Sequence, residues 1–152
     1  MSRILHLAAT SDLERLERMV AAYHADEGIE SDSAHRQAAL RPLLEGSPHG
    51  AVWLIGPRMS PVGYVAVSFG WSIGMGGMVG CVDELWLREA VRGRGMGSEA
   101  LSALLQTLEN AGVMTMHLQV TNKTRAARIF QRLGFRHRGI ELMTRLSDAI
   151  DG

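Results

Sequence analysis

The sequence predicts an α/β protein with a mixed, mostly antiparallel sheet covered by helices on both faces. Of its 152 residues, 46% are hydrophobic, which suffices for the core of one domain. Apolar residues alternate in some segments and recur every three or four residues in others, as in strands and amphipathic helices. These segments follow the order strand, two helices, three strands, helix, strand, helix and a last pair of strands. Layered packing is the economical way to bury their apolar faces.

The N-terminal third is predicted to form a strand followed by two helices. Residues 3–8 form the strand, and the capping-box pattern Ser11-x-x-Glu14 opens an amphipathic helix that Gly28 ends. A second helix is expected over about residues 33–45. Between the helices lies a loop with several carboxylates.

Three strands are predicted to follow as an antiparallel meander. They cover residues 51–55, 62–71 and 78–87, and Gly-Pro and Ser-Pro pairs separate the first two. Gly74-Met75-Gly76-Gly77 separates the second from the third. Each strand should therefore pair with the next.

The C-terminal half is predicted to alternate between helices and strands. A helix over 98–111 leads to a strand over 114–120, and a second helix follows over 126–133. Residues 135–139 and 140–146 are expected to form the last two strands. The domain would then span residues 1–146, with residues 147–152 as a frayed tail.

Composition excludes several classes of function. The formal net charge is zero, so the chain as a whole has no electrostatic case for binding DNA or an anionic membrane. Cys81 is the only cysteine, which rules out an internal disulfide and a paired-cysteine metal site. No apolar stretch approaches the ~20 residues of a membrane span. We therefore expect a cytoplasmic protein without a metal.

The most informative segment is the glycine-rich loop Arg92-Gly93-Arg94-Gly95-Met96-Gly97, between a strand and a helix. Free N–H groups and the dipole at a helix N-terminus favour phosphate. A dinucleotide fingerprint requires a third glycine where Ser98 stands, and no Gly-Lys-Ser or Gly-Lys-Thr of a Walker loop occurs. The loop predicts a phosphate-bearing ligand outside these two nucleotide folds.

Two ordered motifs resemble the GNAT superfamily of N-acetyltransferases. Arg92-x-x-Gly95-x-Gly97, after Asp83-Glu84-Leu85-Trp86-Leu87 and before a leucine-rich helix, is similar to its acetyl-CoA-binding motif. Asn122, Ala126, Phe130 and Leu133-Gly134-Phe135 resemble its second motif. Together they cover residues 81–135.

Two positions depart from the family pattern. Asn122 stands one residue further than usual from the aromatic position. Phe130 stands where a tyrosine often protonates the leaving thiolate, and phenylalanine donates no proton. Since a thiol has an ordinary pKa near ~8.5, water or the departing ammonium could supply that proton instead.

The resemblance implies direct transfer of an acetyl group from acetyl-CoA to a primary amine of a small molecule or protein, without a covalent acyl-enzyme. The pantetheine arm would lie between diverging fourth and fifth strands and pair with backbone of Leu85, Trp86 and Leu87, the Leu87 N–H polarising the thioester carbonyl. The pyrophosphate would lie against the glycine loop. The residues assigned to the cofactor are Leu85, Trp86, Leu87, Arg92, Gly93, Arg94, Gly95, Met96, Gly97, Ser98, Asn122 and Phe130.

Adjacent carboxylates in a strand are the candidates for the general base. Glu84 is the first choice and Asp83 the second, because an acid in mid-strand costs free energy unless it is exposed or paired. Alternation would send them to opposite faces, and both could instead serve only in ion pairs. His24 and His117 are further candidates for relaying a proton.

The amine acceptor is expected between the loop joining the first two helices and the tip of the hairpin of the third and fourth strands. Glu27 and Glu30, with Asp26 and Asp32, would attract a cation, and Trp71 would supply an apolar wall. Solvated charges and core packing explain the same residues without a site.

Two alternatives remain open. An acetyl-CoA-binding sensor would keep the loop without catalysing transfer. A module that binds nucleic acid or a phosphopeptide would instead use the stripe Arg125, Arg128 and Arg132, although no aromatic residues interleave with it. The sequence leaves a homodimer open.

Overall fold

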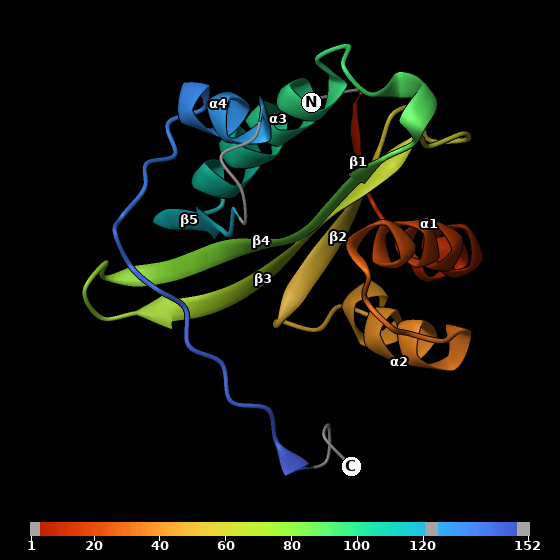
Figure 1. Ribbon diagram of the computed structural model, residues 1–152, viewed down its shortest axis with the longest axis horizontal. Helices are drawn as coiled ribbons and strands as arrows, with labels where there is room; N and C mark the ends of the chain where they lie inside the picture. The colour runs from red at the N-terminus through yellow and green to blue at the C-terminus, as the bar shows by residue number, and fades with distance from the viewer. Residues whose placement is uncertain (1–3, 121–124, 149–152) are drawn as a thin grey trace.

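Helices cover both faces of a five-stranded sheet in the computed structural model, which describes residues 4–120 and 125–148 (Figure 1). Neighbouring strands are antiparallel except for the last pair, which is parallel. Across the sheet the strands lie in chain order: β1 (Leu5–Leu7), β2 (Gly50–Ile55), β3 (Gly63–Ser72), β4 (Gly77–Leu87) and β5 (Thr115–Leu118). The predicted fold class is confirmed.

Two layers of helix enclose two separate cores. On one face lie α1 (Leu13–Glu27) and α2 (Ser33–Leu44), and on the other α3 (Met96–Asn110) and α4 (Arg125–Arg132) (Figure 1). The core under α1 and α2 contains buried Leu16 and Tyr64; that under α3 contains buried Leu101 and Leu104. No described helix is long and apolar enough to cross a membrane.

The first helix begins differently from the prediction. A short 3-10 helix, η1 (Thr10–Asp12), precedes α1, so the Ser11 capping box does not form. Instead the Asp12 carboxylate accepts a hydrogen bond from the Ala9 N–H at 2.8 Å and lies 3.2 Å from Arg58 Nη1. The buried carboxylate takes the capping role because it also gains an ion pair.

A bulge interrupts β4 beside the candidate base. Glu84 pairs with Ala66, but Val82 pairs with the next residue of β3, Val67, so Asp83 is the extra residue. Such a bulge breaks the alternation of side chains and increases the local twist. The regular alternation on which the prediction of opposite faces for Asp83 and Glu84 rests therefore does not hold at this pair.

The predicted last strands are absent from the described chain. Residues 135–147 have no regular secondary structure, and the segment leaves α4 and runs away from the sheet (Figure 1). The strand predictions over 135–139 and 140–146 were wrong because a strand requires a paired neighbour as well as a suitable sequence.

Candidate active site

The loop between β4 and α3 has the backbone of an anion site. It begins with the 3-10 helix η2 (Glu89–Val91). Gly93 and Gly95 both have a φ of 79°, and Gly95 is the N-cap of α3. A Cβ at either glycine would meet no atom within 4 Å, so the space at the loop is open. The first N–H groups of α3 have no acceptor within the helix. These features fit a phosphate.

Gly97 serves a different purpose from the other two glycines. A Cβ at Gly97 would lie 3.2 Å from the Leu87 Cδ1 atom, which is tighter than ordinary van der Waals contact. Its lack of a side chain lets the first turn of α3 approach the end of β4. Met96 packs in the same core, and Ser98 is half-buried beside it.

The two arginines of the loop have different surroundings. Arg92 donates from Nε to the Leu87 carbonyl at 2.7 Å, and its Nη2 lies 3.1 Å from the Asp26 carboxylate on α1. Its guanidinium therefore ties the loop to the strand end and to α1. Arg94 is exposed and makes no hydrogen bond or ion pair with any described residue. Of the two, Arg94 is the guanidinium available to an anion.

One edge of β4 is unpaired where the resemblance predicts the pantetheine arm. The parallel pairing with β5 ends at Val82 and Leu118, whereas β4 continues to Leu87. No described strand covers that edge from Asp83 onward, and the bulge at Asp83 lies where the pairing ends. Apart from the Leu87 carbonyl, which accepts from Arg92 Nε, the backbone groups along this edge can pair with an extended ligand.

Side chains at the end of β4 divide between the two faces. Leu85 and Leu87 pack in the α3 core, and Trp86 packs against the α1 core. The Trp86 Nε1 lies 3.4 Å from Asp26 Oδ2. The Trp86 ring therefore lies on the opposite face of the sheet from the side chains of Leu85 and Leu87.

Glu84 lies in a nearly buried hydrogen-bond network on the α1 face. The Tyr64 hydroxyl donates to Glu84 Oε1 at 2.8 Å, and His24 Nε2 lies 2.7 Å from Oε2. The side chains of His24 and Glu84 are 11% and 18% exposed, so the pair is shielded from most of the solvent without being sealed. Both carboxylate oxygens are engaged.

The network continues from His24 to the loop between α1 and α2. His24 Nδ1 lies 2.6 Å from Ser31 Oγ, which accepts from Arg36 Nη1 at 3.1 Å. Arg36 is held in turn by Glu17 at 2.6 Å. A neutral imidazole that donates from Nε2 to Glu84 accepts the Ser31 hydroxyl proton at Nδ1. In this tautomer the hydroxyl of Ser31 donates to His24 and His24 donates to the Glu84 carboxylate.

Burial and negative charge shift several pKa values around Glu84. Burial and the Glu84 carboxylate raise the pKa of Tyr64, so the phenol stays protonated and remains a donor. Loss of hydration and the Glu84 charge raise the pKa of Asp83, and His24 partly opposes them. Burial, Glu27, Glu84 and Asp83 raise the pKa of Tyr23. The carboxylates thus make the electrostatic potential around Glu84 negative.

The predicted acceptor residues are only partly brought together. Glu27 and Glu30 lie exposed at and just beyond the end of α1, close in sequence to His24 and Ser31. Trp71 is 74% exposed and lies five residues along β3 from the partner of Glu84, roughly 17 Å away at the rise of a strand. It therefore does not line the same part of the fold.

Two acids of the acceptor loop have structural partners. Asp26 pairs with Arg92, and Asp32 caps α2 by accepting from the His35 N–H at 2.8 Å. That leaves Glu27 and Glu30 as the acids available to a cation there.

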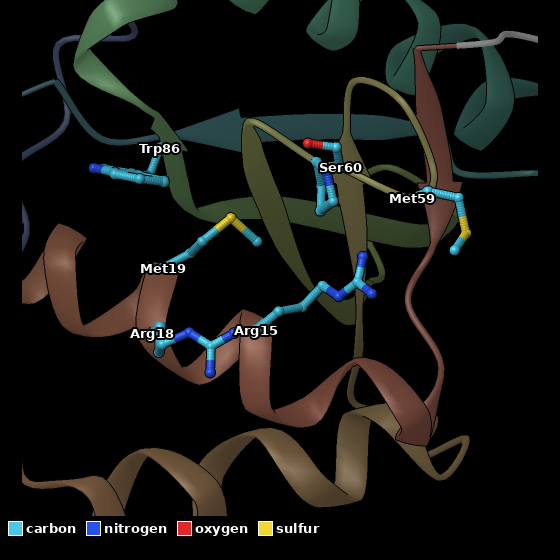
Figure 2. Close-up of a pocket in the computed structure, with 7 residues that line it drawn as sticks. Arg15, Arg18, Met19, Met59, Ser60 and Trp86 are labelled. Atoms are coloured by element: carbon cyan, nitrogen blue, oxygen red, sulfur yellow. The ribbon is translucent and has the colours of Figure 1, made fainter.

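A shallow hollow on the α1 face adjoins the end of β4 (Figure 2). In Figure 2 the side chains of Arg15 and Met19 rise from α1 toward the loop between β2 and β3, and Trp86 closes one side. The lining residues are Arg15, Arg18, Met19, Met59, Ser60, Pro61 and Trp86. Glu84 is not among them.

The second sequence motif is described only in part. Asn122 lies outside the described residues. The Phe130 ring packs edge-on against Phe135 at a centroid distance of 6.2 Å, in the core under α3. In this position Phe130 contributes packing.

Tyr64 and Ser31 are the members of the network that the sequence argument missed. Tyr64 occurs in a strongly apolar strand, where a tyrosine reads as a core residue. Once the register is known, Tyr64 is seen to lie two residues from Ala66, the partner of Glu84, which indicates that its hydroxyl can reach the carboxylate. Ser31 has no local pattern that distinguishes it.

The family of the chain follows from a match over residues 13–135 to the model of the acetyltransferase (GNAT) family. The chain belongs to that family. It is thus an acetyltransferase of the acetyl-CoA-dependent GNAT class. No curated protein sequence matches it.

Several solved structures share the fold. A Cole Harbour Salt Marsh integron cassette protein is 26% identical, covering 93% of this chain and 89% of its own, with a TM-score of 0.83. A predicted acetyltransferase from Clostridium acetobutylicum, solved with acetyl-CoA, is 16% identical over 93% and 94%, with a TM-score of 0.76. The aminoglycoside N-acetyltransferase AAC(6')-Iy with CoA is 16% identical over 93% of each chain, with a TM-score of 0.77.

Proposed function

We propose that this GNAT protein transfers the acetyl group of acetyl-CoA to a primary amine by direct attack, with both substrates bound together. The observation that carries the proposal is the arrangement along β4. Glu84 lies where the pairing of β4 with β5 has ended. The unpaired edge of β4 continues from there to Leu87, and the open loop suited to phosphate follows the strand. Two substrates can meet across such a strand.

The cofactor-binding part of the proposal rests on backbone. Gly93, Gly95 and the first N–H groups of α3 would hold the pyrophosphate, with Arg94 adding charge. The edge from Leu85 to Leu87 would pair with the pantetheine arm, and the Leu87 N–H would polarise the thioester carbonyl. Two solved structures of the same fold contain acetyl-CoA or CoA, which supports this ligand.

Glu84 would act as the general base, directly or along the path through His24 and Ser31. The charged amine gives up one proton to this network, and the neutral amine then forms its bond to the acetyl carbon while the bond from that carbon to sulfur breaks. The bonded nitrogen loses its second proton to solvent. The thiolate leaves and takes a proton from solvent. Asp83, whose pKa is raised, is the second candidate for the base.

The acceptor would be an amine that carries positive charge before it reacts. Glu27 and Glu30 are exposed near the Ser31 end of the network, and the acids around Glu84 add to the negative field. A polyamine, an amino-acid amine, an antibiotic amine and a protein amine all meet this description.

A thiol-release assay with acetyl-CoA and a broad panel of amines tests the function. Release with at least one class of amine, lost in Glu84→Gln, is the expected result. Acetyl-CoA binding without release for any amine would instead indicate a sensor.

Binding of acetyl-CoA is tested separately by thermal unfolding. Acetyl-CoA should raise the Tm, and Gly97→Glu should abolish the shift by placing a carboxylate at the phosphate loop. Gly70→Glu, which adds the same group on β3 beside only Val79, should keep it. No shift in the parent protein at millimolar acetyl-CoA would contradict the proposal.

A further inference from the structure

The shallow hollow of Figure 2 takes no part in the proposed reaction. Its volume is about 440 Å³, which lies within the ~300–1,000 Å³ of small-molecule pockets. Neither Glu84 nor any residue of the loop over 92–97 is among its lining residues. The hollow is therefore distinct from the Glu84 network and from the phosphate loop.

Two arginines one turn apart on α1 make one wall of the hollow positive. Arg15 donates from Nη1 to the Arg58 carbonyl at 3.2 Å, which holds its side chain up against the loop between β2 and β3 (Figure 2). Arg18 is exposed and makes no hydrogen bond or ion pair with another described residue. A guanidinium presents its donors in a planar fork that matches a carboxylate. This wall can therefore hold an anion.

Nearby carboxylates compensate the positive charge only in part. Asp12 Oδ1 lies 3.8 Å from Arg15 Nε, but Asp12 Oδ2 is 3.2 Å from Arg58, so one carboxylate serves two arginines. Glu14 stands four residues before Arg18 and is exposed, and a solvated pair of this kind is weak. Asp12 would repel a doubly charged phosphate more strongly than a carboxylate. A singly charged anion therefore fits this wall best.

The remaining walls of the hollow are mainly apolar. They are formed by Met19 on α1, by Met59 and Pro61 on the loop between β2 and β3, and by Trp86 on β4. Met59 is 83% exposed, so a ligand that covers it removes apolar surface from water. The half-buried Trp86 ring has the Tyr64 ring 6.5 Å away in the core and also lines the hollow. Thioethers and an indole pack well against a flat ring.

We propose that the hollow binds a small aromatic carboxylate, with its charge against Arg15 and Arg18 and its ring against the apolar walls. The ligand class follows from the lining, because a planar anion suits the guanidinium groups and a flat apolar body suits the thioethers and the indole. This inference goes beyond the proposed function and does not depend on it, since the site requires neither acetyl-CoA nor Glu84.

Calorimetric titration of the full chain with phenylacetate, without acetyl-CoA, tests the ligand class. Binding should saturate at millimolar phenylacetate. Acetate keeps the charge without the ring, and 2-phenylethanol keeps the ring without the charge. Each of them, and inorganic phosphate, should bind at least about tenfold more weakly, because each loses one of the two contacts. No saturable binding of phenylacetate, or an equal affinity for acetate or phosphate, would overturn the proposal.

A matched pair of variants at Ser60 tests the location. Ser60 lines the hollow and is exposed, so neither Ser60→Asp nor Ser60→Asn disturbs the core. The two new side chains share a shape and differ in charge. Ser60→Asp should weaken phenylacetate binding at least about tenfold by repelling the ligand and occupying the arginines, and Ser60→Asn should leave it close to that of the parent.

The arginines are tested in the same titration. Arg18→Gln should weaken phenylacetate binding, and since Arg18 has no described partner, the Tm without ligand should stay unchanged. Arg41→Gln removes an exposed arginine of α2 that does not line the hollow, and it should bind phenylacetate as the parent does. Equal affinities in Ser60→Asp and Ser60→Asn, or in Arg18→Gln and Arg41→Gln, would show that phenylacetate binds elsewhere and that the proposal is wrong.

Discussion

At the residue level, the Glu84 carboxylate is held by a donor at each oxygen. Tyr64 and His24 are these donors, and burial keeps the Tyr64 phenol protonated. In the proposed relay, a proton reaches Glu84 through His24. His24 is the member whose far nitrogen connects to the acceptor loop, through Ser31.

Glu84→Gln should lower kcat by about 10²–10⁴-fold, as expected for loss of a general base. The amide preserves the shape of the side chain, so the acetyl-CoA-induced change in Tm should remain. Ser31→Ala separates the two proton routes. It should lower kcat if the proton travels through His24, since the alanine interrupts the path and leaves the His24 contact with Glu84. Full activity in Glu84→Gln would exclude this base.

Asp83→Asn should stabilise the fold at neutral pH. The pKa of Asp83 is raised in the folded chain above its ordinary 3.8, so the folded state binds more protons than the unfolded state between the two values. Stability contributed by the protonated acid is thus lost as pH rises through the raised pKa. Thermal scans from about pH 3 to about pH 8 should show a higher Tm for Asp83→Asn only above the ordinary pKa of the carboxyl. A neutral-pH Tm below that of the parent would contradict the assignment.

At the level of elements, the order of helices and strands up to α4 could be predicted because each face has a clear period and glycine ends several segments. Gly28 and Gly112 indeed follow α1 and α3 in left-handed conformations. Two features escaped the pattern. The bulge at Asp83 depends on the pairing register between β4 and β3, which the sequence of β4 alone does not give. The last strands would need a neighbouring strand to pair with, and the alternation of residues 140–146 says nothing about such a partner.

At the candidate site, the sequence predicted local geometry and missed contacts between distant segments. The proposed phosphate loop, residues 92–97, could be predicted as a glycine-rich turn because its glycines, the preceding strand and the following helix are contiguous in sequence. The ion pair of Arg92 with Asp26 was not predicted, because Asp26 comes from α1, far along the chain. The Glu84 network likewise joins three segments, and only tertiary packing brings Tyr64 and Ser31 to it.

Gly95→Ala tests whether the backbone conformation of the proposed phosphate loop is needed to bind acetyl-CoA. Alanine at the left-handed φ of 79° should cost about 1–2 kcal/mol and disturb the N-terminus of α3, so the KM for acetyl-CoA should rise. Gly112→Ala is the matched control, because its φ is 95° and its Cβ would also meet no atom within 4 Å. Urea unfolding should show similar losses, and only Gly95→Ala should affect KM. Equal KM values for the two variants would remove the loop from the cofactor site.

At the level of the whole molecule, the sheet separates two cores and the proposed chemistry uses both sides of it. The phosphate loop belongs to the α3 layer, and the Glu84 network belongs to the α1 layer. β4 is the element common to both. The ion pair between Arg92 and Asp26 links the two layers directly. Most other effects of one layer on the structure of the other must pass through the sheet.

Independent cores predict additive losses of stability. Leu16→Ala and Leu104→Ala each remove a side chain that is 0% exposed and should each cost about 2–5 kcal/mol. Because the two leucines lie on opposite faces of the sheet, the double variant should lose the sum within about 0.5 kcal/mol in urea unfolding. Leu101→Ala with Leu104→Ala, two neighbours in the α3 core, provides the comparison and should deviate more. Equal deviations in the two pairs would mean that the sheet transmits packing changes between its faces, and the two layers would then behave as one core.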